Sequence, residues 1–164
     1  MNKNTLLKYF SLMVLFYTCS ACVAEECAFN KNLFLEKMYS ENKAIVSHTW
    51  SEKQKEVKGV LKNGNIFTVK HWSCNHYGTH AIMIVGPYSA TIPEVLNKDF
   101  LSLANIALQK DEVTLLKHYL DNKKIKLLPE PQKFTVPSEQ FSEFYISSAV
   151  ANELIIMEIK LYKD

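Results

Sequence analysis

The sequence predicts an α+β fold, an antiparallel β-sheet of about five to six strands with a short N-terminal helix and a central helical pair packed on one face. Three observations predict it. An Asn-Gly turn joins two strand-like runs, two helical patterns follow each other in the middle of the chain, and the C-terminal run alternates apolar and polar residues. Strands and helices in separate blocks are typical of α+β folds with antiparallel sheets. The chain has 164 residues, of which 48% are apolar and 22% charged, as in an ordinary globular domain.

The N-terminal third of the predicted domain begins with a helix and continues into a hairpin. Residues 31–42 place apolar side chains at helical spacing after Asn30, a potential cap. Residues 47–56 are polar except for Trp50 and are expected to form a loop. Asn63-Gly64 then predicts a two-residue turn between strands 56–62 and 65–73. This turn pairs Lys62 with Asn65, Leu61 with Ile66 and Val60 with Phe67.

A third strand is expected over residues 79–86, which are rich in branched side chains. A four-residue loop, Cys74 to Tyr77, would join it to the preceding strand. This loop pairs Ser73 with Gly78, His71 with His80, Val69 with Ile82 and Phe67 with Ile84. Trp72 would lie on the opposite face with Ala81 and Met83. Moving the register by one residue would place His71 and His80 on opposite faces.

The second half predicts two helices followed by strands. Residues 94–108 and 112–123 each carry an apolar stripe, and Asp111 could cap the second helix. Pro129 and Pro131 end the helical region. Strands are expected at 132–136, 141–147 and 153–162, with Ser148–Asn152 as the last connection. In the final run Glu153, Ile155, Met157, Ile159 and Leu161 share one face, and Leu154, Ile156, Glu158, Lys160 and Tyr162 share the other.

The first residues are typical of a bacterial export signal. Lys3 and Lys8 precede a nearly apolar run from Tyr9 to Tyr17, and small residues follow. That run is too short to span a membrane. Cleavage after Ala24 would leave residues 25–164 as a single domain in the periplasm or outside the cell. Alternatively, residues 1–21 form a lipoprotein signal and Cys22 is lipidated, which would anchor the protein to the membrane.

Charge and cysteine content limit the classes of partner and the compartment that the sequence indicates. All 19 basic residues are Lys, and loss of Lys3 and Lys8 leaves 17 Lys against 17 acidic residues. A neutral mature chain without Arg does not indicate nucleic-acid binding. Cleavage after Ala24 leaves Cys27 and Cys74, which are expected to form a disulfide in an oxidising compartment.

Residues 71–80 concentrate the reactive and aromatic side chains, and three uses are open. As a partner-binding loop, a protruding hairpin tip tied down by the disulfide would present Trp72, Asn75, His76, Tyr77 and Gly78. As a metal site, it would use His71, His76 and His80, although their spacing fits no strong metal pattern. As a catalytic site, it would use His76 or His80 as a base, and a carboxylate would have to come from elsewhere in the fold. Each has an ordinary structural alternative, semi-buried histidines and packed aromatic rings.

The order of a strand, a Cys-x-His loop and an apolar strand resembles the inhibitory loop of the periplasmic inhibitor of vertebrate lysozyme family. The resemblance implies that His76 enters the cleft of a muramidase. It covers about 20 of the 164 residues, and this chain lacks the second loop cysteine of that family.

The combined expectation is a small exported protein that binds another protein and is not an enzyme. Within that class an inhibitor or immunity protein is favoured, with a secreted or cell-wall-directed hydrolase or toxin as its partner. We expect no cofactor. A periplasmic metal-binding protein, a hydrolase and a structural envelope lipoprotein are the alternatives.

Overall fold

The computed structural model describes residues 34–73, 76–86, 93–123, 125 and 130–163. It confirms the α+β class, with seven strands in the sheet rather than five to six. The predicted signal, both candidate cleavage sites, Cys22, Cys27, Cys74 and Asn75 lie outside the described residues. Of the helix expected over 31–42, the structure has α2 (Lys37–Ser40), and residues 34–36 and 41–42 are not helical.

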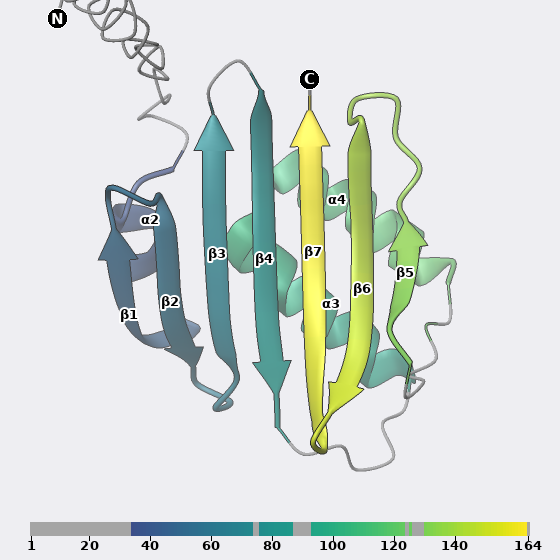
Figure 1. The fold of residues 1–164 in the computed structure, drawn as a ribbon, viewed down its shortest axis with the longest axis horizontal. Helices are drawn as coiled ribbons and strands as arrows, with labels where there is room; N and C mark the ends of the chain where they lie inside the picture. The colour runs from purple at the N-terminus through teal and green to yellow at the C-terminus, as the bar shows by residue number, and fades with distance from the viewer. Residues whose placement is uncertain (1–33, 74–75, 87–92, 124, 126–129, 164) are drawn as a thin grey trace, which may run out of the picture.

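The sheet is antiparallel throughout, in the order β1-β2-β3-β4-β7-β6-β5 (Figure 1). Its strands are β1 (Ile45–Ser51), β2 (Glu56–Leu61), β3 (Ile66–Ser73), β4 (Tyr77–Val85), β5 (Gln132–Thr135), β6 (Glu143–Ala151) and β7 (Leu154–Lys163). The C-terminal strand β7 lies in the middle of the sheet, between β4 and β6. It therefore brings the last ten described residues beside the strand that carries Gly78 and His80.

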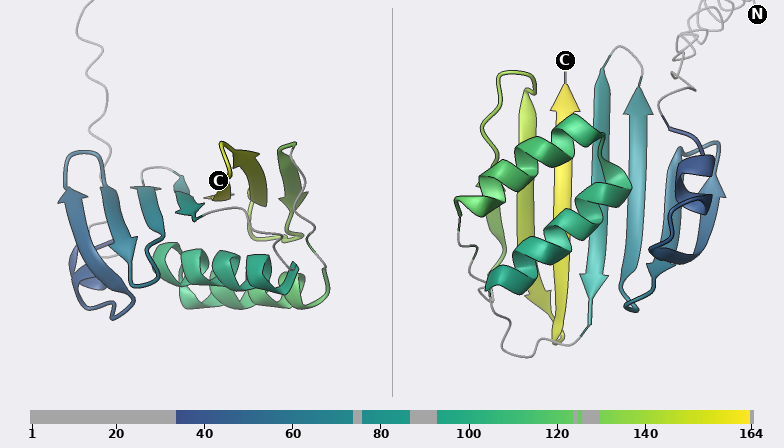
Figure 2. Two further views of the ribbon diagram at one scale, coloured as in Figure 1. Left: turned by 90° about the horizontal axis from the view of Figure 1, so that it is seen from below. Right: turned by 180° about the vertical axis from the view of Figure 1, so that it is seen from behind.

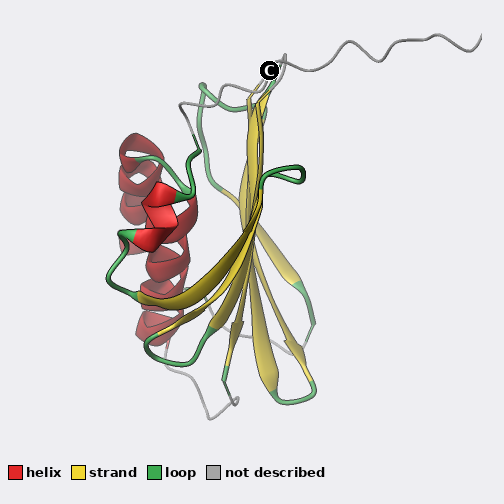
Figure 3. Cartoon of the chain, turned by 90° about the vertical axis from the view of Figure 1, so that its left-hand side faces the viewer, coloured by secondary structure: helices red, strands yellow, loops and turns green. Residues whose placement is uncertain are grey.

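The helices lie on one side of the sheet, as expected. Helices α3 (Pro93–Ala107) and α4 (Lys110–Asp121) cross one face of the sheet, which we call the inner face (Figure 2). Helix α2 lies on the same side, against β1 (Figure 3). The core between them contains Leu96, Phe100, Leu103, Leu116 and Leu120 from the helices and Val69, Ala81, Met83, Met157 and Ile159 from the strands. The N-cap of α4 is Gln109 rather than the expected Asp111. Its N–H donates a hydrogen bond of 2.8 Å to the Glu112 carboxylate, as in a capping box.

Residues 45–51 form strand β1, so the expected loop over 47–56 is wrong for its first half. The reason is position. An edge strand is exposed on several sides, so its residues carry little apolar alternation. Trp50 supplies the inward contact, because its ring stacks 5.8 Å from that of buried Tyr39.

The Asn63-Gly64 hairpin is present, but its register differs by one residue from the expectation. Gly59 pairs with Phe67 and Val60 with Ile66. The loop has three residues rather than two, because Gly64 has a φ of 86° and the Leu61 N–H donates to the Asn65 carbonyl. This is a type I turn followed by a left-handed glycine, which adds one residue to the loop.

The β3–β4 register also differs by one residue. Ser73 pairs with Tyr77, His71 with Thr79 and Lys70 with His80. The expected pairing of His71 with His80 is therefore wrong, and the two histidines project from opposite faces of the sheet. Tyr77 is the first residue of β4 rather than the last of the loop, which shortens the connection to three residues.

The last hairpin is tighter than expected. Strand β6 runs to Ala151, and the turn consists of Asn152 and Glu153, whose φ angles are 49° and 65°. Two consecutive positive φ angles make a two-residue turn that suits the twist of the sheet. Glu153 is thus a turn residue, whereas the other residues expected on its face, Ile155, Met157, Ile159 and Leu161, are buried against the helices.

No described helix covers the second face of the sheet, which we call the outer face (Figure 3). Its side chains form rows across the strands. One end carries the row Val60, Ile66, Ile84, Ile156 and Ala149, and the other end carries Trp72, Gly78, Tyr162 and Glu143. Polar and charged residues occupy much of the area between these rows.

Gly59 is expected to be required for packing on the inner face. A Cβ there would lie 2.6 Å from the Phe67 ring and 2.7 Å from the Ser47 carbonyl oxygen. We expect Gly59→Ala to lower the free energy of unfolding by about 1–3 kcal/mol, because the ring and a backbone atom would both have to move. Gly86→Ala is the matched control, since no atom lies within 4 Å of its Cβ position. Urea unfolding of both variants checks this, and equal stability would contradict the packing described.

Candidate functional site

Three rings gather on the outer face where β3, β4 and β7 meet. The Tyr162 ring centroid lies 6.3 Å from that of Trp72 and 5.5 Å from that of His76. Trp72 lies near the end of β3 and His76 is the last residue of the β3–β4 connection, whereas Tyr162 comes from the C-terminal strand. We call these three residues the aromatic cluster.

Gly78 creates the space that the Trp72 ring occupies. The two residues are cross-strand partners, and a Cβ at position 78 would lie 2.3 Å from the indole. The ring therefore lies directly over the glycine backbone. Any larger residue would push the ring away and change the surface of the cluster.

A hydrogen-bonded polar group lies next to the aromatic cluster on the same face. Its centre is the Glu158 carboxylate, which accepts hydrogen bonds from His80 Nε2 at 2.7 Å and from the Ser147 hydroxyl at 2.7 Å. The Tyr145 hydroxyl donates a longer one of 3.4 Å. The His80 and Glu158 side chains are both about one-third exposed, so this group faces solvent.

Ion pairs continue the polar region toward β5. Glu143 pairs with Lys160 at 3.0 Å and with Lys133 at 3.2 Å, and these interactions lower the pKa of the Glu143 carboxyl. The Lys133 ammonium also lies 3.6 Å from the centre of the Tyr145 ring. Charges of both signs are thus interspersed, and the outer face has no large region of a single sign.

His71 faces inward and belongs to a buried network. Its Nε2 is hydrogen-bonded to the Tyr39 hydroxyl at 2.5 Å and its Nδ1 to the Thr79 hydroxyl at 3.0 Å. The Phe34 ring stacks on the imidazole at a centroid distance of 3.6 Å. Burial lowers the pKa of His71 to about 3, so the ring is neutral at physiological pH.

Tyr77 also lies on the inner face, away from the rest of the expected partner-binding loop. Its ring stacks on Phe34 at a centroid distance of 5.7 Å. Its buried hydroxyl has no partner with hydrogen-bond geometry among the described residues. Burial, together with the nearby Glu112 carboxylate, raises the pKa of Tyr77. Glu112 is itself only 7% exposed, and burial raises its pKa.

The structure therefore divides the residues predicted from the sequence. Trp72, His76 and Gly78 lie together on the outer face, Tyr77 and His71 lie inside, and Asn75 and the two predicted disulfide cysteines lie outside the described residues. His71 cannot share an ion with His80, because the sheet lies between their side chains. Within the described ranges no group of three or more His, Cys, Asp or Glu side chains is placed to hold a metal ion.

Tyr162 and Glu158 are the site residues that the sequence-based prediction missed. The alternation of the last strand put both on one face with Lys160. What it did not indicate was the neighbour of that face, because β4 and β7 are separated by two helices and two strands in the sequence. Their pairing joins Gly78 to Tyr162 and His80 to Lys160.

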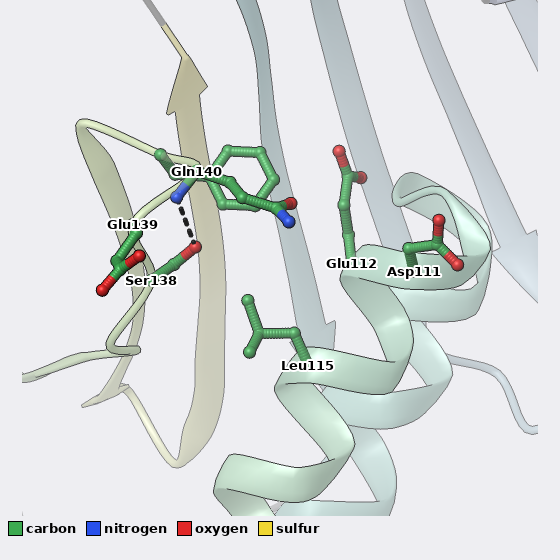
Figure 4. A pocket seen from close by; sticks show the side chains of 7 residues that line it. Asp111, Glu112, Leu115, Ser138, Glu139 and Gln140 are labelled. Carbon is green, nitrogen blue, oxygen red and sulfur yellow. Dashed lines mark hydrogen bonds between the residues drawn. The ribbon is translucent and has the colours of Figure 1, made fainter.

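The inner side of the molecule has a separate surface pocket of about 350 Å³ between α4 and the β5–β6 connection (Figure 4). Leu115 and Phe141 form its apolar part, and Asp111, Glu112, Ser138, Glu139 and Gln140 its polar part. The Gln140 N–H donates to the Ser138 hydroxyl at 3.1 Å, which folds the connection back on itself. None of the residues predicted as a site from the sequence lines this pocket.

The hydrolase alternative required a carboxylate within hydrogen-bond reach of His76 or His80, and Glu158 supplies one for His80. The order of the contacts is nevertheless unlike that of a nucleophilic triad. In a triad the histidine lies between the hydroxyl and the carboxylate. Here Glu158 lies between His80 and Ser147, so the imidazole does not activate that hydroxyl.

Comparison with known proteins adds no relative. No family model, no curated protein and no solved structure matches the chain significantly. The similarity to lysozyme inhibitors therefore remains a resemblance of one short segment. Among the described helices, none is both long and apolar enough to cross a membrane.

The burial of His71 leads us to predict that the free energy of unfolding falls at acid pH. Its pKa is about 3 in the folded protein, whereas an unfolded histidine has a pKa of about 6.5. As the pH falls below about 6.5 the unfolded chain binds a proton that the folded chain does not, so the stability falls. Between about pH 7 and about pH 5 the free energy of unfolding should drop by about 2 kcal/mol through this group.

Urea unfolding at several pH values checks this prediction. In His71→Gln the fall over that range should be smaller by the same amount, whatever the variant's stability at neutral pH. His118→Gln, which alters an exposed histidine on α4, should keep the dependence of the original protein. An unchanged pH dependence in His71→Gln would contradict the assignment of His71 as a buried neutral group.

Proposed function

We propose that this protein is an exported binding protein, not an enzyme, and that the outer face around the aromatic cluster binds another protein. Its partner is a secreted or cell-wall-directed hydrolase or toxin, which makes the protein an inhibitor or an immunity protein. The observation that carries the binding role is the position of Trp72, His76 and Tyr162 on a sheet face that no described helix covers.

The chemistry of this surface supports a protein partner. Trp and Tyr provide large contact areas with few rotatable bonds, and they are enriched at binding hot spots. Trp72 and Tyr162 lie on β3 and β7, each paired with a strand on both sides, and His76 directly precedes β4, so little backbone order has to be gained on binding. The surrounding Lys160, Glu143 and Glu158 suit the polar rim of an interface.

The nature of the partner follows from the predicted export. A small exported chain with a neutral mature charge would meet enzymes and toxins of the envelope rather than nucleic acid. The resemblance of the segment around His76 to the lysozyme inhibitory loop supports an enzyme as the target. In this arrangement His76 and Trp72 approach the partner first, because they lie in and next to the β3–β4 connection at the end of the sheet.

Affinity capture from envelope and secreted fractions tests the proposal, followed by titration calorimetry with the captured enzyme or toxin. We expect Tyr162→Ala and His76→Ala to weaken binding by at least about tenfold, because each removes a ring from the contact surface. Tyr119→Ala, which removes an aromatic ring from α4 on the other side of the sheet, is the matched control. Tyr77→Ala is unsuitable, because Tyr77 packs inside.

Thermal unfolding of each variant separates binding from folding effects. The proposal predicts normal unfolding of His76→Ala and unchanged affinity in Tyr119→Ala. Affinity unchanged from the original protein in all three variants would contradict binding at the outer face. Loss of binding only in Tyr119→Ala would contradict it as well.

The His80–Glu158 pair supports a second candidate function, acid–base catalysis by His80 on the outer face. Glu158 would orient the imidazole and stabilise its protonated form. A panel of ester, glycoside and peptide substrates tests this directly. Turnover that His80→Gln abolishes, with partner binding intact, would favour the enzyme over the binding protein.

A further inference from the structure

Strand β1 forms one edge of the sheet. It pairs with β2 on one side, and no described strand pairs with its other side. Such an edge presents backbone N–H and C=O groups that can pair with another chain. The segment Ile45–Ser51 has seven residues and contains no proline, lysine or acidic residue. Its register shifts between Ile45 and Ser47, as at a β-bulge, and Ser47–Ser51 pair regularly with β2.

The opposite edge differs in length and composition. Strand β5 has four residues, Lys133 lies within it, and Pro131 and Pro137 flank it. Short length, lysine and proline are the usual devices that prevent edge strands from pairing with other molecules. Strand β1 has a register shift between Ile45 and Ser47 but none of these three devices, so the backbone groups of Ser47–Ser51 are open to pairing.

Exposed apolar side chains accompany the open edge. Val46 on β1 is 65% exposed, Leu35 just before α2 is 47% exposed, and Met38 on α2 is 46% exposed. Tyr39 on α2 makes the inward contact, because its buried ring stacks on that of Trp50. The Glu36 Oε1 atom lies 3.8 Å from His48 Nε2 on β1. Helix α2 thus packs against β1, while Leu35 and Met38 stay exposed and outside the core.

We propose that β1 pairs antiparallel with β1 of a second copy, so that two sheets join into one across a two-fold axis. An axis perpendicular to the sheet reverses the strand direction and keeps the helices of both copies on the same side. The two α2 segments then flank the axis, where Leu35 and Met38 can be covered. A strand without lysine or carboxylates suits a two-fold contact, because each residue near the axis meets its own kind.

We assign a second copy of this chain, rather than an unrelated strand, to the β1 edge, because the strand edge and its exposed apolar neighbours can serve both sides of the contact. The edge offers backbone pairing, and the adjacent segment offers apolar area. A two-fold interface uses each of them twice and needs no further partner. This surface lies at one edge of the sheet, so it is separate from the proposed binding site on β3, β4 and β7.

Sedimentation equilibrium of the processed protein, recovered from cells that express the full chain, tests the proposal. We expect a monomer–dimer equilibrium. Thr49→Lys places two like charges near the axis and should raise the dissociation constant by at least about fivefold. Thr135→Lys makes the same change on β5 and should leave the dissociation constant within about twofold of the original value.

Two further measurements make the result decisive. Hydrogen exchange should show β1 amides that are protected in the dimer and exchange faster in Thr49→Lys. Tyr162→Ala should dimerise normally, which separates this inference from the proposed function. A protein that stays monomeric overturns the proposal, and protected β1 amides in that monomer would assign the edge to its own chain. Dimerisation unaffected by Thr49→Lys overturns it as well.

Discussion

The pairing of β3 with β4 is the constraint on which both faces of the sheet depend. Because His71 is opposite Thr79, its imidazole faces inward between the Tyr39 and Thr79 hydroxyls. The next pair, Trp72 and Gly78, then faces outward, and the indole lies on the glycine backbone. A shift of β3 by one residue would bury Trp72 and expose His71. The buried network and the aromatic cluster therefore result from the same register.

The central position of β7 supplies the other half of the candidate site. Without this strand, Trp72 and His76 would be two rings at one end of a hairpin. Tyr162 joins them from the far end of the sequence, and Glu158 reaches His80 one row away. The site is thus assembled from two segments about 80 residues apart in the chain, and it exists only when the whole sheet has formed.

Local sequence patterns predicted much of the fold but not its registers or its strand order. The helical stripes, the Asn-Gly turn and the alternation of Ile155, Met157 and Ile159 each depend on neighbours in sequence, and each was found. The β2–β3 register failed because Gly64 takes a left-handed conformation in a three-residue loop. The polar edge strand β1 and the β4–β7 pairing had no local signal, since tertiary contacts stabilise both. Tyr162 therefore stayed outside the predicted site.

The central claim is that the outer face around Trp72 and Tyr162 binds a protein partner. Hydroxyl-radical footprinting of the protein, free and in complex with the captured enzyme or toxin, tests it most directly, because it reports the exposure of each side chain without mutation. We predict that Trp72 and Tyr162 become less reactive toward hydroxyl radicals in the complex, while the reactivity of Tyr119 on α4 is unchanged. Protection of Tyr119 with Trp72 and Tyr162 unaltered would contradict it and place the partner on the helices.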